Sequence, residues 1–118
     1  MAHPLLQKLF NEVIKIFDHT ILETYRDLER QNYLHRIKKT KVMFPGSRHN
    51  HMPSMAVDAA PYPIDWDDER RFCLFAGIVK ALAYTMGIPI RWGGDWDGDT
   101  QLKDNKFNDY CHFELLLE

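Results

Sequence analysis

Two short segments of the chain place histidines and carboxylates among apolar residues. Residues 46–58 read Gly-Ser-Arg-His-Asn-His-Met-Pro-Ser-Met-Ala-Val-Asp, and residues 109–114 read Asp-Tyr-Cys-His-Phe-Glu. Histidine nitrogens combined with a carboxylate oxygen are a ligand set that suits a mononuclear zinc ion. Because the two segments lie far apart in the chain, a fold that uses them together must bring them side by side.

Alternation with a period of two indicates that both segments enter β-strands, whose side chains point to opposite faces in turn. A strand over 55–59 would direct to its apolar face Met55, Val57 and Ala59. A strand over 111–117 would direct to the same kind of face Phe113, Leu115 and Leu117. Asp58 lies on the opposite face of the first strand, and His112 and Glu114 lie on the opposite face of the second. If the strands are neighbours, Asp58 and His112 converge.

A histidine of the loop before residue 55 would complete a three-ligand shell and leave a fourth position open for water, as in catalytic rather than structural zinc sites. Zinc lowers the pKa of its water towards about 7, so a nearby carboxylate can take the proton as the water attacks a carbonyl. Asp109 is the candidate base. Glu114 is the candidate partner that orients the imidazole of His112. These residues predict a peptidase with one Zn²⁺ per chain.

The motifs resemble the zinc D-Ala-D-Ala carboxypeptidase and L-Ala-D-Glu endopeptidase family, which includes bacteriophage endolysins and belongs to the hedgehog/DD-peptidase fold group. Between about Ile21 and Leu117 the matching elements are, in order, Tyr25-Arg26 with Gln31, Ser47-Arg48-His49, Ala56-Val57-Asp58, Trp92-Gly93-Gly94-Asp95-Trp96, and Asp109 to Glu114. The resemblance implies that Arg26 steadies the substrate carbonyl in the transition state and that Gln31 belongs to the same element. We expect Ser47 to support the loop by hydrogen bonding, and Trp92, Trp96 and Tyr110 are candidates to line a substrate cleft.

The spacing before Asp58 departs from the family pattern Ser-x-His-x-x-Gly-x-Ala-x-Asp, because two extra residues separate Ser47 from Asp58. Counting forward from Ser47 selects His49 as the ligand, and counting back from Asp58 selects His51. We favour His49, because an insertion that includes Pro53 can be absorbed in the loop while Ser-x-His stays intact. If both histidines bound, the site would be four-coordinate and closed.

The resemblance implies an α+β fold, with a small antiparallel sheet, helices packed on one side of it and a single zinc site on the sheet. The sequence itself predicts strands over 20–25, 55–59, 88–92 and 111–117. Helices are predicted over 5–17, 27–38 and 65–86, with Asp27 and Asp65 as N-caps of the second and third. Long polar loops are predicted over 39–54 and 93–108, and alternating acids at 95–99 resemble a calcium loop that lacks its later glutamate.

Length and composition limit the remaining possibilities. The 118 residues predict a single zinc peptidase domain, 1–118, without a separate wall-binding domain. A net charge of −2 gives no sign of nucleic-acid binding. No apolar run is long enough to insert into a membrane, and the N-terminus lacks the pattern of a signal peptide. We therefore expect a monomer made in the cytoplasm, for example of a phage-infected bacterium, that acts on the cell wall after release.

The function predicted from these observations is hydrolysis of the peptide stem of bacterial peptidoglycan, as an endolysin-like L-alanyl-D-glutamate endopeptidase. An alternative on the same site is a D-Ala-D-Ala carboxypeptidase. A second class is a catalytically silent, zinc-stabilised binding module, which predicts a four-ligand site that includes His51. A third interpretation, that the histidines are incidental, predicts no bound metal.

Overall fold

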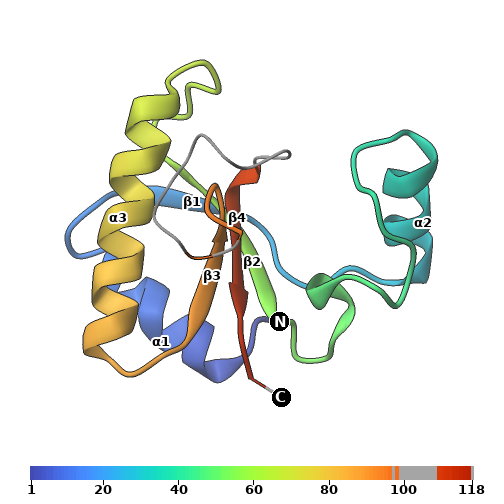
Figure 1. The fold of residues 1–118 in the computed structure, drawn as a ribbon, viewed down its shortest axis with the longest axis horizontal. Coiled ribbons are helices and arrows are strands. Elements are labelled where there is room, and N and C mark those ends of the chain that lie inside the picture. The colour runs from blue at the N-terminus through green and yellow to red at the C-terminus, as the bar shows by residue number, and fades with distance from the viewer. Residues whose placement is uncertain (97, 99–108, 118) are drawn as a thin grey trace.

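Four strands form one antiparallel sheet in the order β1–β2–β4–β3 (Figure 1). They are β1 (His19–Glu23), β2 (Ala56–Pro61), β3 (Ile90–Gly93) and β4 (Asp109–Leu115). The computed structural model describes residues 1–96, 98 and 109–117. The strand order places β2 and β4, which carry the two polar motifs, next to each other in the middle of the sheet.

The described residues also form three α-helices and one short 3₁₀ helix: α1 (Pro4–Val13), α2 (Leu28–Arg36), η1 (Arg48–Asn50) and α3 (Glu69–Thr85). Figure 1 shows α1 and α3 together beside the sheet, whereas α2 stands apart at the end of long connections. The predicted α+β class with an antiparallel sheet is confirmed. Among the described residues, no helix is long and apolar enough to cross a membrane.

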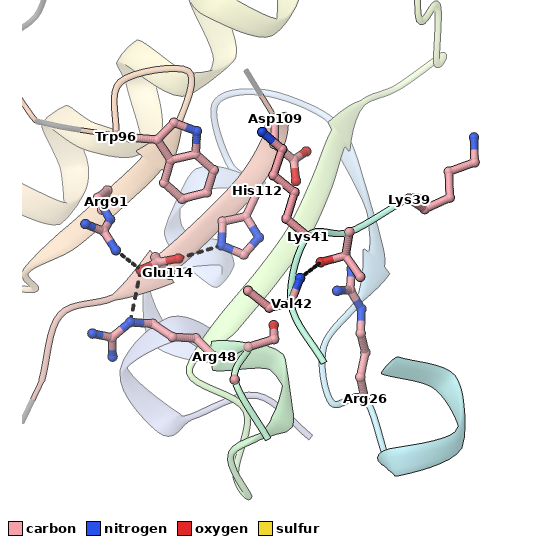
Figure 2. Close-up of a pocket in the computed structure, with 13 residues that line it drawn as sticks. Arg26, Lys39, Lys41, Val42, Arg48, Arg91, Trp96, Asp109, His112 and Glu114 are labelled. Carbon is pink, nitrogen blue, oxygen red and sulfur yellow. Dashed lines mark hydrogen bonds and ion pairs between the residues drawn. The ribbon is translucent and has the colours of Figure 1, made fainter. Parts of the chain in front are cut away.

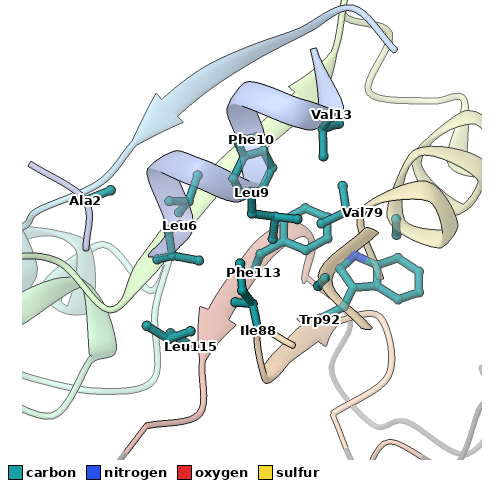
Figure 3. Packing of buried hydrophobic residues seen from close by; sticks show 14 of the residues in the cluster. Ala2, Leu6, Leu9, Phe10, Val13, Val79, Ile88, Trp92, Phe113 and Leu115 are labelled. Atoms are coloured by element: carbon teal, nitrogen blue, oxygen red, sulfur yellow. The ribbon is translucent and has the colours of Figure 1, made fainter. Parts of the chain in front are cut away.

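The core lies between the sheet and the two helices α1 and α3, and it contains the apolar faces predicted for β2 and β4 (Figure 3). Phe113 of β4 is fully buried, and its ring meets Phe10 of α1 and Phe75 of α3 edge to face, with centroids 5.7 and 5.9 Å apart. Val57 of β2 joins the same cluster. Since side chains alternate along a strand, Asp58 is directed to the other face.

The largest differences from the predicted element bounds are at two helix ends, whereas the other predicted ends shift by one or two residues. The first helix ends at Val13, four residues early, and Phe17 reaches the core from the following turn, with its ring 5.4 Å from Phe75. The N-cap of α3 is Asp68, whose carboxylate accepts from the backbone N–H of Arg71 at 3.1 Å, so the predicted cap Asp65 is wrong. The apolar spacing of the first helix continues into the turn that follows it. Asp65 instead caps a separate turn, where its carboxylate accepts from the N–H of Asp67 at 3.0 Å, before the third helix begins.

The cap of α2 and the strand pairing follow the prediction. Asp27 accepts a hydrogen bond from the N–H of Arg30 at 2.8 Å, which satisfies one of the free donors of the first helical turn. In the β2–β4 pair, Asp58 is the register partner of His112 and Val57 is the partner of Phe113. The convergence of Asp58 and His112 is therefore built into the sheet.

Truncation of a core aromatic should destabilise the protein far more than truncation of an exposed one on the same helix. Phe75 is fully buried and Tyr84 is 90% exposed, and both belong to α3. We expect Phe75→Ala to lower the free energy of unfolding by about 3–5 kcal/mol, because it removes buried contacts and leaves a cavity. Tyr84→Ala should change it by less than about 0.5 kcal/mol. Urea denaturation measures both, and equal losses would contradict the assigned packing.

Candidate active site

Three buried side chains bring one ligand atom each to a common point. The distances are 3.2 Å from His49 Nε2 to Asp58 Oδ1, 3.2 Å from His49 Nε2 to His112 Nδ1, and 3.2 Å from His112 Nδ1 to Asp58 Oδ1. Ligand atoms about 2.0–2.2 Å from a tetrahedral ion lie roughly 3.3–3.6 Å from one another. The triangle therefore has nearly the size that a metal requires, and the group could hold a metal ion.

Different local structures hold the three residues in place. Asp58 and His112 face each other across β2 and β4. His49 lies in η1, whose N-cap is Ser47. The hydroxyl of Ser47 accepts from the N–H of His49 at 3.2 Å, and the side chain of Asn50 accepts from the N–H of Ser47 at 3.0 Å. This reciprocal capping makes Ser47 the residue that shapes the turn carrying His49.

Outer hydrogen bonds set which nitrogen of each imidazole points to the common point. Nδ1 of His49 lies 2.6 Å from the carbonyl oxygen of Thr24, which can only accept, so Nδ1 carries the proton and Nε2 presents a lone pair. Nε2 of His112 lies 2.8 Å from Oε1 of Glu114, which leaves Nδ1 for the shared site. Such partners fix the tautomer and orientation of metal-binding histidines. Glu114 thus lies where a partner of His112 was expected.

The structure separates the two candidate histidines of the loop. His51 is exposed and lies outside the group formed by His49, Asp58 and His112. The extra residues Met52 and Pro53 are exposed as well. The loop therefore absorbs the insertion on the surface, and the count from Ser47 identifies the histidine that reaches the site.

Hydrogen bonding within the cluster outweighs the effect of burial on its pKa values. Burial alone would raise the pKa of Asp58, but its contacts with the imidazoles of His112 and His49 hold it well below its usual range. Burial would lower the pKa of His112, but hydrogen bonds to Asp58 and Glu114 raise it to about 9. The pKa of Glu114 is lowered to about 2, against the effect of burial, by hydrogen bonds from His112 and Arg91. The carboxylates of Asp58 and Glu114 and the imidazolium of His112 are thus oppositely charged groups joined by hydrogen bonds.

A cavity of about 340 Å³ opens onto this cluster (Figure 2). Asp109, His112 and Glu114 of β4 line it, together with Arg26 and Trp96. Burial raises the pKa of Asp109, and the nearby charge of Asp58 raises it further. A carboxylate whose pKa is shifted towards neutrality beside such a group is suited to exchange protons with a substrate or water.

Gly93 has a direct part in placing Asp109. The two residues are register partners in β3 and β4, and a Cβ atom at Gly93 would collide with the carbonyl oxygen of Asp109. A glycine is therefore required for β4 to begin so close to β3. The Gly-Gly pair noted in the sequence thus acts on the position of the candidate base.

Arg26 contacts the cluster from the end of β1. Its Nη2 donates to Oδ2 of Asp58 at 3.1 Å, and its Nε forms an ion pair with Glu23 at 3.0 Å. Its Nη1 donates to Oε1 of Gln31 at 3.4 Å. Gln31 is buried and donates to the carbonyl oxygen of Val42 at 2.8 Å. Arg26 therefore holds Oδ2 of Asp58, and Gln31 connects α2 to the loop that contains Val42.

The aromatic residues are arranged differently from the sequence expectation. Trp92 is 4% exposed and belongs to the core, where its indole N–H donates to the carbonyl oxygen of Tyr110 at 2.8 Å. Neither Trp92 nor Tyr110 lines the cavity. Trp96 does, with its ring centroid 5.4 Å from that of His112. Of the three aromatic candidates, Trp96 therefore lies at the cavity, whereas strand parity turns Trp92 into the core and Tyr110 lies outside the lining.

The calcium-like pattern over 95–99 falls partly outside the described residues. Asp95 is described, and its buried carboxylate forms an ion pair with Lys80 at 3.2 Å.

Two arginines near the cluster were not recognised from the sequence. Arg48 Nε and Arg91 Nη2 donate to the same atom, Oε2 of Glu114, at 2.9 and 2.7 Å. Arg91 is the register partner of Glu114 in β3 and β4, so strand parity would have indicated it once that pairing was assumed. Arg48 occupies the variable position of the Ser-x-His motif, so the motif itself does not mark it as functional.

The fold and the site define a small α+β protein whose buried His-Asp-His group could hold a metal ion at one wall of a cavity. Comparison with protein families makes this specific: the chain belongs to the phage L-alanyl-D-glutamate peptidase family, which matches residues 1–116. The protein is accordingly a peptidoglycan endopeptidase of the endolysin type. This confirms the function predicted from the sequence.

The fold is also that of a solved relative. The crystal structure of the L-Ala D-Glu endopeptidase ChiX of Serratia marcescens superposes with a TM-score of 0.77 at 24% sequence identity, over 97% of this chain and 80% of that chain. This similarity shows the shared fold. A search of curated proteins found no match.

The raised pKa of His112 predicts how the stability of the metal-free protein depends on pH. Folding raises this pKa from 6.5 to about 9. The protonated imidazole therefore stabilises the folded state fully below about pH 6.5, and this contribution is lost as pH rises through about 9. We expect the free energy of unfolding, measured with urea in the presence of a chelator, to fall over this interval. The His112→Asn variant should show a flatter profile, and equal slopes in both proteins would contradict the assignment.

Proposed function

We propose that this endopeptidase is zinc-dependent and that one ion per chain is held by His49 Nε2, Asp58 Oδ1 and His112 Nδ1. The observation that supports this most directly is the triangle of three buried ligand atoms, each 3.2 Å from the other two. Two imidazoles and one carboxylate suit zinc, whereas calcium and magnesium prefer shells of oxygen. Three protein ligands leave a position for water beside the cavity, as catalysis requires.

The residues around this group divide the chemical work. A zinc ion bound there would supply a Lewis acid and would lower the pKa of a coordinated water towards about 7. Asp109, on the cavity wall, takes the proton of the attacking water and returns it to the amine released from the glutamyl residue. Glu114 keeps the ring of His112 in the required tautomer through their 2.8 Å contact.

Arg26 acts in two ways in this proposal. Its contact with Oδ2 of Asp58 leaves Oδ1 of that carboxylate directed to the metal position. It also lines the cavity, where a guanidinium can stabilise the charge that develops on the scissile carbonyl oxygen. The first part is a positioning role that the sequence did not suggest. The second is the role implied by the family resemblance.

We propose that the protein acts as a monomer on the peptide stem of the cell wall. The substrate bond we propose is that between L-alanine and D-glutamate, in agreement with the family. Hydrolysis there would separate the stem peptide from the glycan strand that carries L-alanine.

The two loop histidines provide a matched test of the ligand assignment. We expect His49→Ala to lower both zinc affinity and kcat/KM by more than about 100-fold, since losing a ligand should cost more than losing its outer partner. His51→Ala should retain both, because His51 is exposed and outside the group. Zinc content after dialysis and mass spectrometry of digested peptidoglycan give the two readouts. Loss of zinc from His51→Ala but not from His49→Ala would overturn the assignment.

Replacement of the base should separate chemistry from metal binding. We expect Asp109→Asn to lower kcat by about 10²–10⁴-fold while zinc content is unchanged, because the side chain keeps its shape but cannot accept the proton. Asp67→Asn is the control, since Asp67 is exposed and does not line the cavity. Unchanged release of stem peptide by Asp109→Asn would remove Asp109 as the base.

The masses of the released fragments also show which bond of the stem peptide is cut. Release of free D-alanine would indicate the carboxypeptidase instead, and zinc retention without any product would indicate a silent binding module.

A further inference from the structure

The cavity beside the catalytic group is lined by more positive than negative side chains. Its lining includes five cationic residues, which are Arg26, Lys39, Lys41, Arg48 and Arg91. Two carboxylates, Asp109 and Glu114, line the same space. Because a partly enclosed site strengthens electrostatic interactions, this excess favours a ligand that carries negative charge.

The excess of positive charge is concentrated at one point of the lining, where two guanidinium groups share a single carboxylate. Arg48, from η1, and Arg91, from β3, both contact Oε2 of Glu114, while Oε1 of Glu114 is used by His112 (Figure 2). One carboxylate compensates one of the two arginines. A second anion beside the pair would complete the charge balance without displacing Glu114.

Both arginines keep donors available for that anion. Among the described residues, Arg48 uses only Nε, and neither of its terminal nitrogens has a hydrogen-bond partner. Arg91 uses Nη2, and its Nη1 has no hydrogen-bond partner in the described part of the chain, whereas its Nε is buried. The side chains are 32% and 39% exposed, so a ligand in the cavity can reach them. Guanidinium groups with adjacent free N–H groups suit carboxylates, which accept two parallel hydrogen bonds.

The substrate of an L-alanyl-D-glutamate peptidase offers such a carboxylate. A glutamyl residue within a peptide stem uses its amine for the scissile bond and one carboxyl group for the next residue, so its other carboxyl group remains free. This group lies within one residue, about 3.8 Å of chain, of the scissile bond. The arginines contact Oε2 of Glu114, whose Oε1 contacts Nε2 of His112, so a single side chain separates them from a proposed metal ligand.

We propose that Arg48 and Arg91 form a subsite for the free carboxylate of the glutamyl residue and thereby select the substrate. The inference rests on the proposed endopeptidase function, since it assumes that this residue supplies the leaving amine. It gives the two arginines a second role besides holding Glu114: they bind substrate directly. A stem whose carboxylate is converted to a primary amide should be a poorer substrate.

The test pairs two synthetic stem peptides that differ only in this group, one with the free carboxylate and one with the primary amide. For the zinc-loaded wild-type protein we expect kcat/KM to be at least about tenfold higher for the acid, the effect of one charge-assisted hydrogen bond. Arg48→Gln and Arg91→Gln should each reduce this preference to below about threefold. The matched control Arg70→Gln removes an exposed arginine of α3 outside the cavity lining and should keep the preference.

The ratio between the two peptides separates substrate recognition from the positioning of Glu114. If the arginines only hold Glu114, their loss lowers cleavage of both peptides by the same factor and the ratio stays, which would overturn the proposal. Equal cleavage of acid and amide by the wild type, or loss of the preference in Lys41→Gln instead of the arginine variants, would also overturn it. Two independent arginine variants keep the test usable if one fails to fold.

Binding measurements distinguish this inference from the function on which it rests. Calorimetric titration of Asp109→Asn with the two peptides should show tighter binding of the acid, by about tenfold, even without turnover. If the wild-type protein cleaves neither peptide but the inactive variant still prefers the acid, the subsite stands and the assigned bond fails. If the wild type cleaves both and no preference is seen in either assay, the function stands and the subsite fails.

Discussion

The pairing of Asp58 with His112 across β2 and β4 is the contact on which the site depends. These two residues are direct register partners, so their side chains leave the same face of the sheet at neighbouring points. The register is held by the opposite face, where Val57 and Phe113 pack in the core. A slip of either strand by one residue would turn the polar side chain of that strand into the core, so apolar packing and site geometry are set by the same register.

The buried charges around this pair are compensated in layers. Arg26 neutralises the outer oxygen of Asp58, and Glu114 neutralises the far side of the His112 ring. Arg48 and Arg91 in turn compensate Glu114. A buried carboxylate or imidazolium without such a partner would be costly, so each layer requires the next. Arg48 and Arg91, which compensate Glu114, also line the cavity and have further N–H groups there. The same network can therefore contact a substrate.

Much of the site follows from local patterns in the chain. Alternation along two short strands placed Asp58, His112 and Glu114 on one face, and Ser-x-His placed one histidine close to a capped turn. These predictions succeeded because strand parity is decided by nearest neighbours. The sequence did not decide between His49 and His51, because the two extra residues of the loop could be inserted either before or after the ligand histidine. Only the folded loop shows that the exposed insertion follows His49.

The amino-acid sequence by itself determined the α+β class, the alternating faces of the central strands and the set of residues able to form the His-Asp-His group. The tertiary structure alone decided which residues surround that group, because their contacts join segments far apart in the chain. Arg48 and Arg91 meet at Glu114 from η1 and β3, and Trp96 rather than Trp92 reaches the cavity. Local periodicity specifies the direction of a side chain, whereas the identity of its partner depends on how the strands and loops assemble.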